Sequence, residues 1–127
     1  MENTFKPTDA ELEILQILWE FGPATVRFIN DKLNEKKEVG YTTTLKIMQI
    51  MTDKQLLVRE KSGKSHIYSS TVKEKDSQRL LLNRFLENAF SGSASKLVMQ
   101  ALGNHRTSKE ELNQIRELLD KIEKGNK

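Results

Sequence analysis

The stretch from residue 41 to residue 70 constrains the fold more than any other part of the chain. We predict a helix from Thr42, whose hydroxyl can cap it, to about Gln55. Two short segments with β-branched and aromatic residues follow, at 56–61 and 66–69, around a turn that contains glycine. A helix followed directly by an antiparallel hairpin is therefore the unit around which the remaining chain must fold.

The predicted helix has two distinct faces when successive residues are placed about 100° apart. The face that we expect to be buried comprises Thr44, Leu45, Ile47, Met48 and Met51. The outer face comprises Thr42, Thr43, Lys46, Gln49, Ile50 and Asp53. Amide, hydroxyl, methyl and ammonium groups are those that read base edges in the major groove of DNA. An ordinary amphipathic surface helix has a similar outer face, so the helix alone does not decide the function.

The predicted hairpin favours DNA binding over an ordinary surface helix. Its turn at 62–65 places Lys61 and Lys64 at the tip, where they can contact phosphates and so position the protein without specifying a sequence. A helix followed by a basic hairpin is the winged form of helix-turn-helix. The GKS triplet in this turn also resembles the end of a phosphate-binding P-loop. A P-loop requires another glycine five positions before Gly63, and this chain has Val58 there. No helix is predicted to follow the triplet either, so we exclude a P-loop.

The distribution of charge also favours DNA binding by the segment that contains the helix and the hairpin. Residues 1–41 carry a net charge of −3, whereas 42–70 and 71–127 each carry +3. Positive charge thus begins where the proposed DNA-binding elements begin, which is a modest electrostatic indication of a nucleic-acid partner.

Several other classes are excluded by what the sequence lacks. There is no cysteine, which excludes disulfides and thiolate metal sites. No apolar run is long enough for a membrane span, and the acidic N-terminus does not resemble a signal peptide, so we expect a cytoplasmic protein without membrane insertion. His66 and His105 neighbour no catalytic or metal-binding motif. We therefore expect no enzymatic activity, no catalytic residues, no cofactor and no metal.

Two further helices are predicted before residue 41. The first begins at a capping box formed by Thr8 and Glu11 and ends at a Gly-Pro pair. Its apolar stripe comprises Leu12, Ile14, Leu15, Leu18, Trp19 and Phe21. The second helix spans 24–33, with Phe28 among its apolar members, and a charged connector spans 34–40. With the hairpin, these helices predict a three-helix winged domain over 1–71.

The remaining segment, 72–127, is predicted to contain three helices with breaks at 91–93 and 103–107. Ser108 and Glu111 form a second capping box. The apolar residues that we assign to dimerisation are Leu82, Phe85, Leu86, Phe90, Leu97, Val98, Leu112, Ile115, Leu119 and Ile122. So short a segment holds too little chain for a core of its own. We expect it to pair with the same segment of a second chain as a homodimer; the alternative is a monomer in which it folds back on the winged domain.

These residues together resemble the penicillinase-repressor family, the BlaI/MecI/CopY type of bacterial winged-helix repressors. The matching motifs are TDAELEIL at 8–15, LW at 18–19, GPATV at 22–26, YTTTLK at 41–46, KSGK at 61–64, Tyr68, FSGS at 90–93, LV at 97–98 and the opening of the last helix at 108–112. They extend over nearly the whole chain, and their order and spacing are more specific than any one of them.

The resemblance implies a homodimer with an N-terminal winged helix on operator DNA and C-terminal dimerisation helices. It also implies repression of a nearby operon, often one for antibiotic resistance, and induction by a membrane sensor-transducer metalloprotease that leads to cleavage of the repressor. This chain departs from the family pattern at Ile50, where arginine is common, and at Gln55, where glycine is common. It lacks the cysteine pairs of the copper-responsive branch, and Gln100-Ala101 stands where the family has its Asn-Phe cleavage dipeptide.

Two hypotheses of different classes follow. In the first, a dimeric repressor binds an inverted repeat of double-stranded DNA, with bases contacted by Thr42, Thr43, Lys46, Gln49 and Ile50 and phosphates by Lys61 and Lys64. In the second, the winged helix is a protein-interaction adaptor without specific DNA binding. The mixed charge and the apolar Ile50 on the outer face allow the second hypothesis, and binding to specific DNA discriminates between them.

Overall fold

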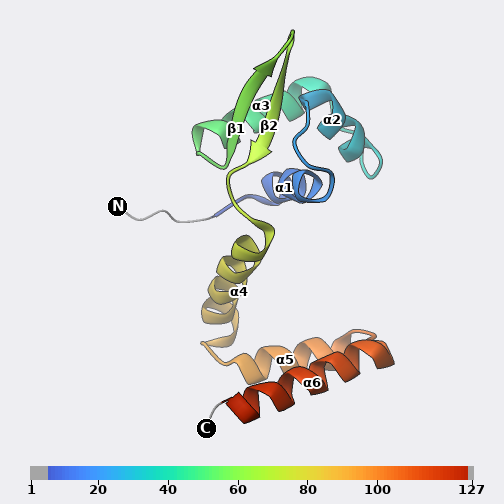
Figure 1. The fold of residues 1–127 in the computed structure, drawn as a ribbon, viewed down its shortest axis with the longest axis vertical. Helices are drawn as coiled ribbons and strands as arrows, with labels where there is room; N and C mark the ends of the chain where they lie inside the picture. The colour runs from blue at the N-terminus through green and yellow to red at the C-terminus, as the bar shows by residue number, and fades with distance from the viewer. Residues whose placement is uncertain (1–5, 126–127) are drawn as a thin grey trace. The chain divides into compact units, whose positions relative to one another are not determined.

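The computed structural model describes residues 6–125, and the chain divides into two compact units, 1–82 and 83–127 (Figure 1). Within the described residues the elements are, in chain order, α1 (Asp9–Phe21), α2 (Val26–Asn34), α3 (Tyr41–Asp53), β1 (Leu57–Ser62), β2 (Ser65–Ser70), α4 (Glu74–Phe90), α5 (Ala94–Asn104) and α6 (Lys109–Gly125). The first unit is a three-helix winged helix with a two-stranded antiparallel wing, and the start of α4. The predicted fold class is confirmed.

α1 begins with the predicted capping box. The Thr8 hydroxyl accepts a hydrogen bond from the Glu11 N–H at 3.1 Å, and the Glu11 carboxylate accepts one from the Thr8 N–H at 3.0 Å. The helix ends at Gly22, whose φ of +88° is accessible to glycine without steric strain. The buried residues of its apolar face are Ile14, Leu15 and Leu18. Trp19 packs against this core and donates its indole N–H to the Val72 carbonyl at 2.9 Å.

α2 begins two residues later than predicted. The Thr25 hydroxyl caps it by accepting a hydrogen bond from the Phe28 N–H at 3.1 Å. Ala24, which was assigned to the helix, instead pairs with Tyr68 of β2 through two backbone hydrogen bonds of 3.0 and 2.8 Å. The backbone of Ala24 is therefore extended, and the base of the wing is joined to the segment between α1 and α2.

Two aromatic side chains lie outside the predicted apolar core. Phe21 is 46% exposed because it is the last residue of α1, and Phe28 is 36% exposed. Their rings pack edge to face at 5.4 Å, and the Lys32 ammonium lies 4.4 Å from the centre of the Phe21 ring. These two rings are shielded by one another and by a cation.

Both ends of α3 differ from the prediction. The N-cap is Gly40, which has no side chain to form a cap, so Thr42 is an exposed residue of the first turn and caps nothing. At the other end, the Leu56 N–H donates to the Met51 carbonyl and the Gln55 N–H to the Thr52 carbonyl. This pattern is a Schellman motif, in which the C′ residue adopts a left-handed conformation. Gln55 occupies that position with φ of +68°.

The wing is a tight hairpin. Its register pairs Leu57 with Ser70 at the base and Ser62 with Ser65 at the tip, which leaves a two-residue turn with Gly63 first. The φ of +63° at Gly63 suits the turn types that match the twist of antiparallel strands. Each end of both strands thus differs by one residue from the predicted ranges of 56–61 and 66–69.

The helices after the wing leave their apolar side chains unburied. α5 extends through Gly103 and Asn104, which were predicted to be loop, and α6 starts at the predicted capping box of Ser108 and Glu111. Among the described residues 83–125 none is buried. Phe85 and Phe90 contact each other edge to face at 5.6 Å between ring centres.

We predict that Gln55→Gly stabilises the protein by about 0.5–1 kcal/mol, because glycine adopts the left-handed conformation without the clash that a Cβ atom produces. The hydrogen bond of 2.7 Å from the Thr71 hydroxyl to residue 55 uses its backbone carbonyl and is retained. Urea denaturation measures the change. Gln55→Ala is the control, since it shortens the side chain but keeps Cβ. An equal gain for both variants would contradict the assignment to backbone conformation.

Candidate nucleic-acid interface

α3 presents the predicted polar face outward. Thr44, Met48 and Met51 are buried, and Leu45 and Ile47 are half-buried. The residues assigned to base contacts are exposed, namely Thr42, Thr43, Lys46, Gln49 and Ile50. The predicted division of the helix into an inner and an outer face is therefore confirmed, and the outer face combines hydroxyl, amide and ammonium groups with one apolar side chain.

The start of α3 is held by one amide of α2. Asn30 donates one N–H to the Thr44 hydroxyl at 2.8 Å and the other to the Val39 carbonyl at 3.0 Å, so both donors of its amide nitrogen are used. Thr44 is fully buried, and this bond satisfies its hydroxyl oxygen. The angle between α2 and α3 is thereby fixed by a polar contact inside the core.

The connector between α2 and α3 is held in the same way. Asn34 accepts a hydrogen bond from the Val39 N–H at 3.0 Å and donates to the Val39 carbonyl at 2.9 Å and to the Asn30 carbonyl at 2.7 Å. The side chain of Asn34 thus completes the backbone hydrogen bonding of a loop that has no regular structure. The turn of the helix-turn-helix is thus held by hydrogen bonds to the side chain of Asn34, although its sequence is rich in charged residues.

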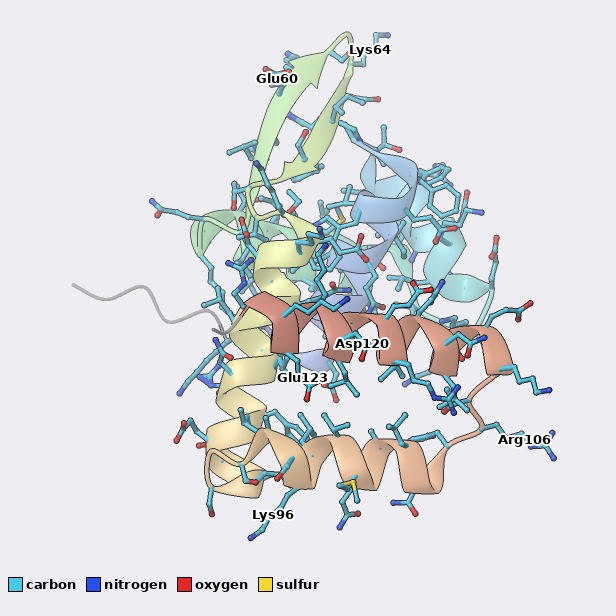
Figure 2. All side chains as sticks on the ribbon, turned by 60° about the horizontal axis from the view of Figure 1, so that its bottom comes forward. Glu60, Lys64, Lys96, Arg106, Asp120 and Glu123 are labelled. Carbon is cyan, nitrogen blue, oxygen red and sulfur yellow. The ribbon has the colours of Figure 1, made fainter. Side chains whose placement is uncertain are left out.

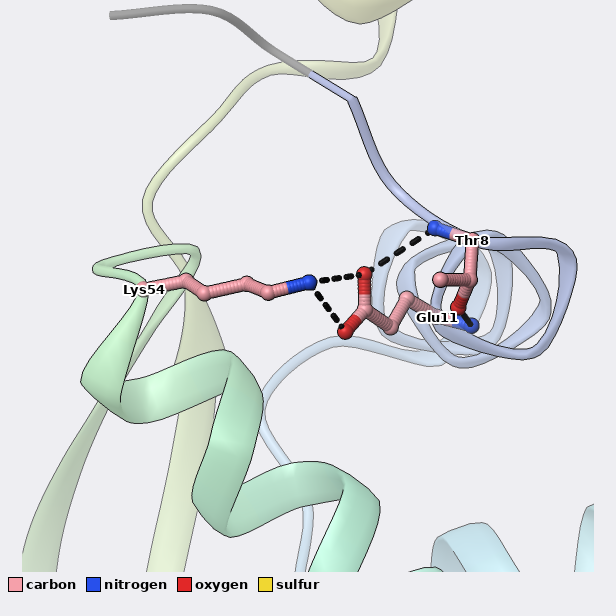
Figure 3. A network of polar contacts seen from close by, with 3 residues as sticks. All are labelled: Thr8, Glu11 and Lys54. Atoms are coloured by element: carbon pink, nitrogen blue, oxygen red, sulfur yellow. Dashed lines mark hydrogen bonds and ion pairs between the residues drawn. The ribbon is translucent and has the colours of Figure 1, made fainter.

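The end of α3 is held by an ion pair to α1 (Figure 3). The Lys54 ammonium donates to both carboxylate oxygens of Glu11, at 3.0 and 2.8 Å. Glu11 is only 3% exposed. Burial raises the pKa of its carboxyl, but the hydrogen bonds from Lys54 and from the Thr8 N–H outweigh burial, so the net pKa is lowered. Glu11 therefore both completes the capping box of α1 and binds Lys54, the C-cap residue of α3.

The register of the wing places its basic residues on one face. Side chains directly opposite each other in an antiparallel pair lie on the same face, and faces alternate along each strand. Arg59 pairs with the buried Tyr68, and Lys61 pairs with His66, so these three polar side chains share the face that packs on the helices. Glu60 lies on the other face, and Figure 2 shows it across the tip from Lys64.

A pocket of about 340 Å³ lies between this face of the wing and the first turns of α2 and α3. We call it the wing pocket, and its lining residues are Thr25, Val26, Arg27, Tyr41, Leu45, Lys64, Ser65, His66 and Tyr68. Of these only Lys64 was identified from the sequence as a contact residue. Arg27, Tyr41 and His66 come from three separate elements, and no spacing in the sequence indicates that they meet.

A second pocket, of about 590 Å³, lies between α1, the connector and α3, and we call it the connector pocket. Its charged lining residues are Glu13, Glu20, Lys32, Glu35, Lys36, Lys37 and Glu38. Acidic groups outnumber basic ones there, whereas the wing pocket has no acidic lining residue. The wing pocket is thus better suited to a polyanion than the connector pocket, which Thr43 of the outer face of α3 also lines.

Other kinds of site find no support in the part of the chain that the structure describes. Within 6–125, no group of three or more His, Asp or Glu side chains is arranged to hold a metal ion. In the same range, no helix combines the length and hydrophobicity needed to cross a bilayer.

The residues assigned to dimerisation are all apolar and lie on α4, α5 and α6. Leu82, Phe85, Val98, Leu119 and Ile122 are exposed. The half-buried members of the set are Leu86, Phe90, Leu97, Leu112 and Ile115. An amphipathic helix whose apolar face is not covered within its own chain is suited to packing against another chain.

A family model described as the penicillinase repressor matches residues 7–121, from α1 through most of α6. The chain belongs to the penicillinase repressor family. This is a family of transcriptional repressors and not of enzymes, in agreement with the absence of catalytic motifs in the sequence. The match extends through the winged helix and the C-terminal helices, so the resemblance inferred from the motifs is confirmed.

Curated relatives cover nearly the full chain at low identity. The penicillinase repressor of Bacillus licheniformis is 23% identical over 113 residues, which are 89% of this chain and 88% of that protein. The methicillin resistance regulatory protein MecI of Staphylococcus aureus is 25% identical over 122 residues, covering 95% of this chain and 99% of MecI. The transcriptional regulator BlaI of Mycobacterium tuberculosis is 24% identical, covering 92% of this chain and 85% of BlaI.

We predict that Glu11→Gln lowers stability at pH 7 by about 1–2 kcal/mol, since a charged hydrogen bond to Lys54 is lost while the amide oxygen still caps α1. The folded pKa of Glu11 lies below its usual 4.5, so its contribution is complete above that pH and is lost as the pH falls through the folded pKa. The difference between wild type and variant should therefore shrink on acidification, as measured by urea denaturation from pH 7 to pH 3.

The control for this titration is Glu13→Gln, which removes the same charge from the exposed face of the same helix. It should leave the pH dependence of stability close to that of the wild type. A stability difference for Glu11→Gln that is as large at pH 3 as at pH 7 would disprove the role of the ion pair.

Proposed function

We propose that this repressor is a homodimer that binds an inverted repeat in double-stranded DNA, with α3 of each protomer in the major groove and the wing on the adjacent backbone. The observation that carries the proposal is the outward polar face of α3 beside a basic wing. Membership in a repressor family supports DNA as the partner. Repression would follow from occlusion of polymerase and needs no chemistry by the protein.

The exposed residues of α3 supply chemically distinct base contacts. The Gln49 amide suits adenine, with which glutamine forms two hydrogen bonds, and Lys46 suits guanine or a nearby phosphate. The methyl groups of Thr42 and Thr43 and the side chain of Ile50, which is 42% exposed, suit thymine methyl groups. Residues 42–50 of α3 therefore carry the specificity in this proposal.

The wing supplies contacts that do not depend on sequence. Lys61 and Lys64 lie at or beside the tip of the hairpin and are exposed. Lysine at such a position neutralises phosphate and fixes the orientation of the protein on the duplex. We therefore propose that residues 61–66 contact the DNA backbone.

The second chain is the proposed partner of the C-terminal helices. The residues 83–125 bury no side chain within this chain, although α5 and α6 carry regular apolar faces. A segment of this length without a core gains stability by covering those faces, and a second copy offers the same faces in return. We accordingly propose a winged-helix DNA-binding domain at 1–71 and a helical dimerisation domain at 72–127.

The dimer determines the geometry of the operator. Two recognition helices related by a two-fold axis read half-sites separated by one or more helical turns, at about 34–36 Å per turn. By analogy with relatives named for penicillinase and methicillin resistance, we propose a resistance-type operon, a cytoplasmic repressor and a membrane sensor protease upstream. We do not propose that this repressor is cleaved, because Gln100 and Ala101 replace the family's cleavage dipeptide.

We predict that Gln49→Ala lowers affinity for the operator by about 1–3 kcal/mol and relaxes specificity at one base pair. In contrast, Lys64→Ala should weaken binding to all duplexes alike and reduce the salt slope by about one unit. The operator is first obtained by selection from a random duplex library. Affinities are then measured by fluorescence anisotropy on the selected duplex and on an unrelated one at several salt concentrations.

The matched control is Lys75→Ala, an exposed lysine of the same unit that lies on α4 and lines neither the wing pocket nor the connector pocket. Its affinity and salt slope should equal those of the wild type. If selection enriches no sequence and no specific complex forms, the adaptor hypothesis replaces the repressor mechanism. Unchanged binding in both Gln49→Ala and Lys64→Ala would exclude this placement of the DNA.

We predict a dimer at micromolar concentration by sedimentation velocity, and a monomer for Leu119→Glu. The reason is that Leu119, which is 56% exposed on α6, would place a charge inside an apolar interface. Lys121→Glu, at an exposed polar position of the same helix, is the control and should remain dimeric. A wild-type monomer at this concentration would exclude the homodimer.

A further inference from the structure

The wing pocket brings together two cationic side chains from elements that are distant in the sequence. Arg27 comes from the first turn of α2 and Lys64 from the wing, which also contributes the imidazole of His66. The remaining lining residues are neutral, and none is acidic. By contrast, the connector pocket of the same unit pairs its lysines with four glutamates. The positive charge of the wing pocket is therefore a local property and does not follow from the composition of the unit.

Arg27 is oriented without being neutralised. Its guanidinium carbon lies 5.4 Å from the centre of the Tyr41 ring, at a distance where a cation and an aromatic face attract each other. Arg27 itself is exposed, and none of the ion pairs identified within 6–125 involves it. An arginine that is held by an aromatic ring, and whose N–H donors are not paired with a carboxylate, can direct its planar guanidinium toward two oxygens of a phosphate.

We propose that the wing pocket binds one phosphate of the DNA backbone, with Arg27 on the α2 side and Lys64 and His66 on the wing side. This inference rests on the proposed function and adds a named backbone site to it. The phosphate bridges two elements that flank the first turn of α3, which Tyr41 begins. Arg27 is thus a positioning residue: it fixes how deeply the base-contacting turn enters the groove and contacts no base.

The charge of Arg27 is tested by salt dependence. Arg27→Gln should lower affinity about tenfold for both the selected operator and an unrelated duplex, because a charged hydrogen bond to phosphate is lost. It should also reduce the slope of log affinity against log salt by about 0.9. Arg27→Lys should restore the slope, since the charge returns. Lys75→Gln, at an exposed position of α4 outside both pockets, is the control and should change neither quantity.

The position of the phosphate is tested by a methylphosphonate scan, in which single backbone phosphates of the operator are made neutral one at a time. At one position per half-site, neutralisation should weaken wild-type binding by more than it weakens binding of Arg27→Gln, because the variant has already lost the arginine contact to that phosphate. If the profiles of the two proteins coincide except for a uniform offset, or if Arg27→Gln keeps the wild-type slope, the phosphate site is excluded while the repressor mechanism stands. If the wild type binds no duplex specifically, the proposed function itself fails.

Thermal unfolding of each variant shows whether a loss of affinity is structural. Arg27 is exposed and its aliphatic stem contributes little to the core, so the melting temperature should remain that of the wild type. A variant that unfolds early is replaced by His66→Gln, which removes a polar group of the same pocket from the other side. Wild-type affinity and an unchanged methylphosphonate profile for that variant would count against the site.

Discussion

Two polar contacts at opposite ends of α3 determine whether this protein has a usable recognition surface. The Asn30 amide holds Thr44 near the start of the helix, and Glu11 holds Lys54 just after its end. Apolar packing alone would permit α3 to rotate about its axis or slide by a fraction of a turn, since hydrophobic contact has no direction. Hydrogen bonds at both ends remove that freedom, so the outward residues keep a fixed register relative to the wing.

Much of this fold could be predicted because its determinants are local. The capping boxes at Thr8 and Ser108 mark helix starts, and the period of 3.6 residues separates the two faces of α3 correctly. The start of α2 could not be predicted, because Ala24 is extended only through its pairing with Tyr68, 44 positions later by their numbers in the chain. Gly40 as N-cap likewise depends on the connector geometry that Asn34 imposes.

The same distinction applies to the interface. The exposed residues of α3 follow from one helical period, so the sequence was sufficient to predict which side chains point outward. The wing pocket depends on three elements meeting in space, and neither Arg27 nor His66 has a distinguishing neighbour in the sequence. The outer face of α3 and this pocket also differ in chemistry. In the proposed complex the helix offers groups that discriminate between bases, whereas the pocket offers charge, which acts on every duplex alike.

The backbone pairing of Ala24 with Tyr68 has a mechanical consequence for the wing. It adds a short third partner at the root of the hairpin, where Leu57 and Tyr68 are also buried, while residues 58–66 beyond it are all exposed. The hairpin is accordingly attached to the domain by backbone hydrogen bonds and buried side chains at its root, whereas beyond the root its two strands are paired, among the described residues, only with each other. The pairing with Ala24 therefore sets the direction in which the wing leaves the segment between α1 and α2.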